Sequence, residues 1–164
     1  MRLFIAIRFS DDVNRKILSC MHDLKKQGVK GNYEPGSNLH LTLAFIGETD
    51  RVSEIRDVMK TVKFQPFRLS FNGYGSFGDV CWLGVKGNQK LQNTVRQLRD
   101  GLRARQIPFD DKKFVPHVTI IRKAQISHGC RPPEIKETML VEKISLMKSV
   151  RSGGKTVYSE IFSI

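Results

Sequence analysis

The residues of this chain best suited to chemistry form two copies of one pattern, His-apolar-Thr-apolar. The copies are His40–Leu43 and His117–Ile120, and almost half of the chain separates them. Each copy lies in a short apolar run that predicts a β-strand, so its His and Thr point to the same face. Two imidazoles that face one another, each beside a hydroxyl, are suited to acid–base chemistry on a phosphodiester.

In that reaction one neutral histidine takes a proton from the attacking water or hydroxyl. The other histidine, protonated, gives a proton to the departing oxygen on the opposite side of the phosphorus. Thr42 and Thr119 would donate hydrogen bonds to the non-bridging oxygens, and a nearby arginine would offset the developing charge. The scheme requires no metal ion and no cofactor. Spacing alone does not decide which histidine is the acid, because the two motifs are too similar.

Other chemical signals in the sequence are weaker. A zinc site normally needs three or four ligands, and neither motif carries a third ligand at a suitable spacing. Gly73–Gly78 resembles GxGxxG but leads into a strand, which favours a tight turn. Gly154–Thr156 resembles the end of a P-loop but lacks the earlier glycine, which favours a hairpin turn. We assign no role to His22 or His128.

Composition and charge narrow the class of protein. The 164 residues are 40% hydrophobic and 27% charged, as in ordinary globular proteins. No apolar segment approaches the roughly 20 residues of a membrane span, and we expect a cytoplasmic protein. Three scattered cysteines favour free thiols over a disulfide framework. The net charge of +12 favours a polyanionic partner such as RNA.

The order of apolar patterns predicts an α+β fold. Residues 28–38 should form a loop, 73–78 a turn, and 124–138 an irregular segment. Helices are expected from a cap at Asp11 or Asp12 to about residue 26, from residue 50 through Val58 and Met59, and at 91–104. Strands are expected at 3–7, 39–46, 67–71, 80–85, 116–122, 140–147 and 156–164. We expect residues 1–164 to form one domain of two similar halves, each supplying one motif strand, with a cleft between them.

Two segments of the chain resemble the signatures of the 2H phosphoesterases. They are Asn38–Gly47 and Phe114–Arg122, and within that superfamily they are most similar to the RNA 2',3'-cyclic phosphodiesterases, historically called 2'-5' RNA ligases. Weaker likeness extends over the first strand, the Gly75–Val85 region and the C-terminal hairpin. The resemblance therefore covers essentially the whole chain.

The resemblance implies a bilobed, pseudo-twofold α+β fold, with two antiparallel sheets facing a central cleft and helices on the outside. It implies hydrolysis of an RNA 2',3'-cyclic phosphate end to a 2'-phosphomonoester. We expect a monomer with no obligatory protein partner. His40 corresponds to the proton donor to the leaving 3'-oxygen, and His117 to the base that activates water. Thr42, Thr119 and Arg122 correspond to phosphate-binding positions.

Arg122 presents a geometrical difficulty for this interpretation. It follows His117 by five residues, so strict strand alternation directs it to the opposite face of the sheet. A β-bulge or the end of the strand would have to turn it toward the cleft. If neither occurs, Arg122 is a solvated residue beside Lys123.

Three alternative functions remain compatible with the sequence. The same groups could run the reaction in reverse and join RNA ends through a 2'-5' linkage, or could act on a small cyclic nucleotide. The chain could also be a nucleotide- or RNA-binding module with little turnover. The intact His and Thr of both motifs argue against the binding module, because binding alone does not require two matched proton carriers.

Overall fold

The computed structural model describes residues 1–164 and places four antiparallel strands in a first sheet. The order across this sheet is β10-β9-β1-β3, so that β3 is an edge strand. Its members are β1 (Arg2–Arg8), β3 (His40–Glu48), β9 (Ser145–Ser152) and β10 (Lys155–Ser163). Strand β1 is buried from Leu3 to Ile7, which explains its uninterrupted apolar sequence.

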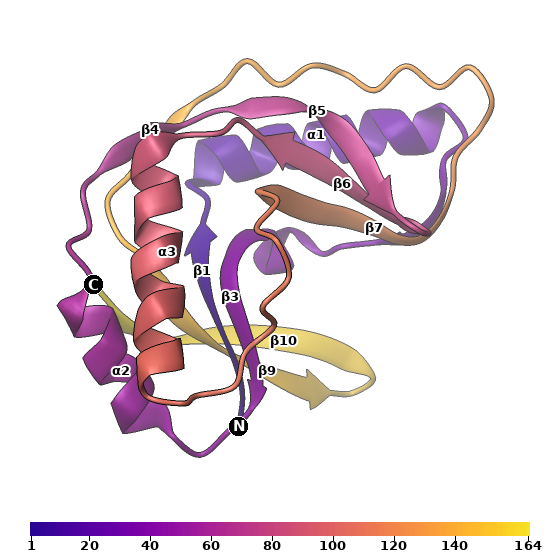
Figure 1. The fold of residues 1–164 in the computed structure, drawn as a ribbon. Coiled ribbons are helices and arrows are strands. Elements are labelled where there is room, and N and C mark those ends of the chain that lie inside the picture. The colour runs from indigo at the N-terminus through magenta and orange to yellow at the C-terminus, as the bar shows by residue number, and fades with distance from the viewer.

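A second antiparallel sheet faces the first (Figure 1) and has the strand order β2-β7-β6-β5. Its members are β2 (Lys30–Tyr33), β5 (Phe71–Phe77), β6 (Val80–Val85) and β7 (His117–Gln125). A short ribbon pairs β4 (Phe67–Leu69) with β8 (Met139–Val141), and a single 3-10 turn spans Gly36–Asn38. The two motif strands, β3 and β7, therefore belong to different sheets.

Three helices cover the outer faces of the sheets. Helix α1 (Asp11–Lys26) lies along the second sheet, whereas α2 (Val52–Thr61) and α3 (Gln89–Ala104) lie beside the first, as Figure 1 shows. The Ser10 hydroxyl caps α1 by accepting from the Val13 amide, and Asn88 caps α3 in the same manner. None of these helices is long and apolar enough to cross a membrane.

One hydrophobic cluster of 34 buried residues joins the two sheets. It includes Leu41 and Leu43 from β3 together with Val118 and Ile120 from β7. These residues alternate with the motif His and Thr, so burying the apolar residues of each strand directs the polar ones toward the cleft. The α+β fold with two antiparallel sheets and outer helices confirms the predicted fold class.

The structure corrects two predicted irregular segments. Residues 28–38 were expected to form a loop but contain β2, an exposed strand that pairs with β7 and has no apolar alternation to reveal it. Residues 73–78 were expected to form a turn, but β5 continues to Phe77 and only Gly78 and Asp79 turn the chain. Position 75 of this strand requires glycine, because a Cβ atom there would be 2.4 Å from the ring of Trp82, its partner on β6.

Several predicted strand limits also differ. The expected strand at 140–147 divides into β8 and β9, which belong to different sheets. The second motif strand continues to Gln125, where the sequence predicts an irregular segment, because Lys123 takes a positive φ of 52° without ending the pairing. Helices α1 and α3 end where predicted, and all three helices begin within two residues of the predicted positions. The cap of α1 is Ser10, one residue before the predicted Asp11 or Asp12, because its hydroxyl reaches the Val13 amide.

Candidate active site

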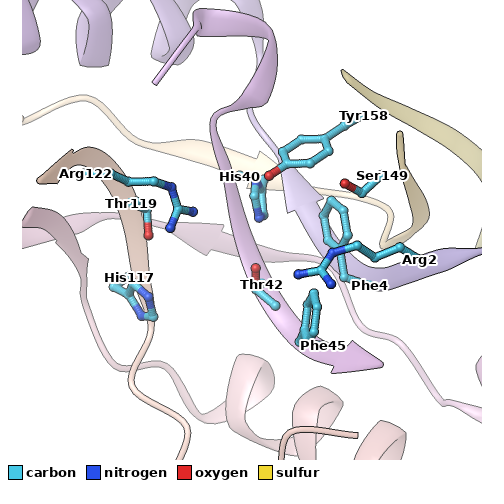
Figure 2. A pocket seen from close by; sticks show the side chains of 10 residues that line it. All are labelled: Arg2, Phe4, His40, Thr42, Phe45, His117, Thr119, Arg122, Ser149 and Tyr158. Atoms are coloured by element: carbon cyan, nitrogen blue, oxygen red, sulfur yellow. The ribbon is translucent and has the colours of Figure 1, made fainter. Parts of the chain in front are cut away.

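The two sheets bring both His-apolar-Thr-apolar motifs to one cavity of about 160 Å³. Figure 2 shows His40 and Thr42 on β3 pointing toward the same space as His117 and Thr119 on β7. Arg122 lines this cavity as well. All five residues proposed from the sequence as the site are therefore close together, although they come from two regions far apart in the chain.

The two histidines are held in the same way. Nδ1 of His40 lies 2.7 Å from the Asn38 carbonyl oxygen, and Nδ1 of His117 lies 2.5 Å from the Val115 carbonyl oxygen. A carbonyl only accepts, so each Nδ1 carries a hydrogen and donates it. Each Nε2 is then the atom that exchanges a proton in the cavity, which is the tautomer that acid–base chemistry in the cleft requires.

Aromatic rings enclose both imidazoles. The His40 ring centroid is 4.8 Å from that of Phe4 and 5.3 Å from that of Tyr158. The His117 ring centroid is 5.1 Å from that of Phe77 and 5.6 Å from that of Trp82. Burial lowers the pKa of His40 from 6.5 to about 4, with smaller contributions from the positive charges of Arg122 and Arg8. In the free protein His40 is therefore neutral at neutral pH.

A β-bulge turns Arg122 into the cavity. Trp82 pairs with Thr119 and Cys81 pairs with Ile121, so Ile120 is an extra residue in β7. Ile120 and Ile121 are consequently both buried, and Arg122 returns to the face of the sheet that carries His117. This is the irregularity that the sequence interpretation required.

The first motif strand contains the same bulge. Ile5 pairs with Ala44 and Ala6 pairs with Thr42, which leaves Leu43 as the extra residue. Phe45 then faces the cavity, five residues after His40, at the position that Arg122 occupies after His117. The two halves thus share their backbone irregularity but differ in the residue that it presents.

At each bulge one backbone carbonyl accepts a hydrogen bond from a residue outside the two strands that form the bulge. The Leu43 carbonyl accepts from Nε and Nη2 of Arg99 on α3, each at 3.3 Å. The Ile120 carbonyl accepts from the Glu34 amide at 2.9 Å. The Glu34 carboxylate in turn accepts from Nε of Arg122 at 2.6 Å, and so fixes the guanidinium beside Thr119.

Sequence reasoning missed five residues that line the cavity. They come mainly from strands at the two ends of the chain and are Arg2, Phe4, Phe45, Ser149 and Tyr158. Phe45 could have been found, because it has the same spacing from His40 as Arg122 has from His117. The others carry no local signal, since only the pairing of β1 with β9 and β10 brings them to the site.

A second cavity, of about 580 Å³, adjoins the first at Thr42, Phe45 and His117. Phe77 and Phe114 supply further aromatic surface, and lysines at positions 112 and 113 supply positive charge. No group of three or more His, Cys, Asp or Glu side chains is placed to hold a metal ion. The side chains of the two cavities can therefore bind a ligand that carries an anion and a flat aromatic group. The two histidines can transfer protons on opposite sides of that anion.

Two antiparallel sheets with paired His-Thr strands across a cleft define the architecture of a 2H phosphoesterase. Residues 18–150 match the family model of the 2'-5' RNA ligase superfamily, and the chain belongs to that family. Similar proteins include the RNA 2',3'-cyclic phosphodiesterase of Aquifex aeolicus, which is 36% identical over 181 aligned positions covering 98% of this chain and 95% of the relative. The protein of the same description from Thermotoga maritima is 35% identical over 74% of this chain and 70% of its own length.

A solved structure confirms the fold. The apo form of LigT from E. coli superimposes with a TM-score of 0.88 at 25% identity, and the match covers 99% of this chain and 95% of that one. The likeness spans both sheets and the helices outside them.

Proposed function

We propose that this protein hydrolyses RNA 2',3'-cyclic phosphate ends to 2'-phosphomonoesters. The observation that carries the proposal is the matched pair of histidines, each fixed through Nδ1 to a backbone carbonyl and each presenting Nε2 to one cavity. Similarity to proteins described as RNA 2',3'-cyclic phosphodiesterases supports the choice of substrate. We further propose that the protein acts as a monomer with no obligatory protein partner, because one copy of the chain supplies both histidines, both threonines and Arg122 to the cavity.

In the proposed reaction the cyclic phosphate lies between the two imidazoles. His117 takes a proton from a water molecule while the oxygen of that water forms a bond to phosphorus. The bond from phosphorus to the ribose 3'-oxygen breaks on the opposite side, and protonated His40 gives its proton to that oxygen. The product carries a 2'-phosphate and a free 3'-hydroxyl, and exchange of protons with solvent restores both histidines.

Three further residues would bind the phosphate. The hydroxyls of Thr42 and Thr119 donate to its non-bridging oxygens from the two sheets. Arg122, oriented by Glu34, offsets the charge that accumulates on those oxygens in the transition state. None of these contributions requires a metal ion or a cofactor.

The low pKa of His40 links its protonation to substrate binding. An imidazole with a pKa of about 4 is neutral at neutral pH, whereas a proton donor must be charged. A bound phosphate places negative charge beside this ring and favours its protonated form. We therefore infer that the cyclic phosphate raises the pKa of its own proton donor as it enters the site.

An RNA substrate is favoured over other phosphodiesters by the surroundings of the site. Phe45, Phe77 and Phe114 line the adjoining cavity, where a nucleobase could stack on an aromatic ring. The net charge of +12 attracts a polyanion.

The direct test is incubation of the purified protein with a short RNA that ends in a 2',3'-cyclic phosphate, in the presence of EDTA. We expect 2'-phosphate ends, and each of His40→Ala and His117→Ala should lower the rate roughly 10²- to 10⁴-fold. Formation of 3'-phosphate instead would exchange the roles of the two histidines. Binding without turnover by the wild-type protein would contradict the proposal and favour a binding module.

A further inference from the structure

Three polar side chains on the first sheet line the cavity but take no part in the proposed reaction. They are Arg2 on β1, Ser149 on β9 and Tyr158 on β10. In the sheet, Arg2 pairs with Ser149 and Ser149 pairs with Tyr158, so the three residues form one row across three strands. Figure 2 shows Arg2 and Ser149 on the side of the cavity away from Arg122, and the Tyr158 hydroxyl beside His40.

The row presents hydrogen-bond donors that have no partner within the protein. No carboxylate lies within 4.0 Å of the Arg2 guanidinium, which lies instead 4.8 Å from the centroid of the Phe45 ring. The hydroxyls of Ser149 and Tyr158 make no hydrogen bond to another residue. Burial raises the pKa of Tyr158, which keeps its hydroxyl protonated and able to donate. Arg122, by contrast, already has Glu34 as a partner.

Arg2 is displaced along the sheet from the reacting groups, whereas the Tyr158 ring packs against His40 with 5.3 Å between the ring centroids. Thr42 pairs with Ala6, whereas Arg2 lies four residues further along β1, roughly 13 Å away at the usual rise of a strand. Its side chain extends back over Phe45, on the far side of Thr42 from Arg122. Arg2 is thus placed for an anion next to the reacting phosphate, at a separate position.

The proposed chemistry indicates which anion this is. The leaving 3'-oxygen is on the His40 side of the phosphorus, so the ribose that carries it must also lie against the first sheet. The 5'-oxygen of the same ribose is joined to the preceding phosphate of an RNA chain. That phosphate should therefore lie over the first sheet, where Arg2, Ser149 and Tyr158 are found.

We propose that Arg2, Ser149 and Tyr158 form a second phosphate subsite that binds the phosphodiester on the 5' side of the terminal nucleotide. This inference rests on the proposed function and specifies its substrate class. The preferred substrate is an RNA end or a 5'-phosphorylated nucleotide, and a nucleoside 2',3'-cyclic phosphate without a 5'-phosphate is a poorer one. A guanidinium that meets a phosphate in a partly enclosed site makes a strong, charge-assisted hydrogen bond.

The test compares three substrates that share one reacting group. They are adenosine 2',3'-cyclic phosphate, its 5'-phosphorylated form, and the dinucleotide ApA that ends in a 2',3'-cyclic phosphate. We expect wild-type kcat/KM to be higher for the two substrates with a 5'-phosphate. Arg2→Gln should reduce that preference about tenfold or more, as expected for the loss of a charged hydrogen bond. Arg122→Gln should lower kcat/KM for all three by a similar factor.

Two results would overturn the subsite. Arg2→Gln could lower kcat/KM equally for all three substrates, which would place Arg2 at the reacting phosphate, or could change none of them. Arg96→Gln, an exposed change on α3, controls for the loss of one positive charge. Far-UV circular dichroism of each variant excludes a folding defect.

A binding measurement keeps this inference separate from the proposed function. Calorimetric titration with adenosine 2'-phosphate and adenosine 2',5'-bisphosphate gives the affinity contributed by the 5'-phosphate, and it needs no turnover. We expect Arg2→Gln to remove most of that contribution. If wild-type protein hydrolyses nothing but shows an Arg2-dependent gain, the proposed reaction fails and the subsite stands. If the wild-type protein hydrolyses the substrates but gains no affinity from the 5'-phosphate, the subsite is refuted and the proposed function stands.

Discussion

Glu34 holds Arg122 twice, once through the side chain and once through the backbone of the bulge before it. The carboxylate accepts from Nε of Arg122 at 2.6 Å, and the Glu34 amide donates to the Ile120 carbonyl at 2.9 Å. Because Nε is occupied, the two terminal amino groups of the guanidinium remain available to the cavity. Glu34 is therefore a positioning residue that acts through Arg122.

Replacing Glu34 separates orientation from charge. Glu34→Ala frees the guanidinium and should lower kcat about tenfold, the cost of one charge-assisted hydrogen bond. KM should stay the same or fall, because a negative charge near the anionic substrate is lost. Glu34→Gln, which keeps an oxygen acceptor, should recover most of kcat. Equal kinetics for all three proteins would show that Arg122 needs no such support.

The protonation of His40 can be followed directly by NMR. We expect its imidazole signal to titrate near pH 4 in the free protein, because burial disfavours the charged ring. Saturation with inorganic phosphate should move that titration upward. The His40→Gln variant assigns the signal, and titration of His40 at 6.5 would contradict the expectation.

The same ionisation affects stability. The folded protein binds this proton less readily than the unfolded chain does, so the free energy of unfolding should decrease as the pH falls from about 6.5 to about 4. The loss attributable to His40 is at most about 3–4 kcal/mol. Urea unfolding of the wild-type protein and of His40→Gln across that pH range isolates the contribution of His40, since the variant lacks the imidazole.

Arg99 should stabilise the first motif strand. Its guanidinium donates twice to the Leu43 carbonyl, which the bulge leaves without a partner on β1. Arg99→Met should remove the donors to that carbonyl and to the Lys112 carbonyl, which accepts from Nη1 at 2.7 Å, and lower the free energy of unfolding by about 1–3 kcal/mol. Arg96→Met on the same helix is the matched control, because Arg96 is exposed and forms no hydrogen bond or ion pair. Equal losses in both variants would refute this role.

Gly75 allows Trp82 to lie flat across β5 and support His117. A Cβ atom at Gly75 would be 2.4 Å from the Trp82 ring, so Gly75→Ala must displace that ring. We expect a loss of roughly 1–3 kcal/mol in unfolding free energy and reduced turnover. Gly87→Ala serves as the control, because nothing lies within 4 Å of a Cβ atom there. An unchanged Trp82 fluorescence spectrum in Gly75→Ala would argue against this displacement.

We propose that residues 1–164 unfold as one cooperative unit, because the 34-residue core includes side chains from both sheets. Trp82, the one tryptophan, reports on the second sheet, whereas far-UV circular dichroism reports on the whole chain. Their urea transitions should coincide. Transitions with different midpoints would show that the two halves unfold separately.

The features predicted correctly are those that depend only on residues close together in the sequence. The alternation of Leu41 and Leu43 with His40 and Thr42 specifies both a strand and the face that its polar residues occupy. The apolar stripe of α1 specifies that helix in the same way. In both cases a periodic apolar pattern has a single arrangement that buries it.

The features that were missed depend on partners distant in the chain. Strand β2 has the sequence KGNY, and only its hydrogen bonds to β7 make it a strand. Arg2 and Tyr158 reach the cavity because β1, β9 and β10 are neighbours in one sheet. From the sequence, the bulge could be named only as the irregularity that would turn Arg122 toward the cavity. The two adjacent isoleucines do not show that Ile120 is left unpaired, because this depends on the register against β6.

The different side chains that follow the two matched bulges, Phe45 and Arg122, have a consequence for the roles of the two histidines. A cleft built from two identical halves would be degenerate: a cyclic phosphate could enter in either of two orientations related by the pseudo-twofold axis, and each histidine would act as acid in half of the turnovers. One aromatic and one cationic residue at equivalent positions remove that degeneracy. Which histidine acts as the acid is then encoded outside the catalytic pair, in the side chain that each bulge turns toward the cavity.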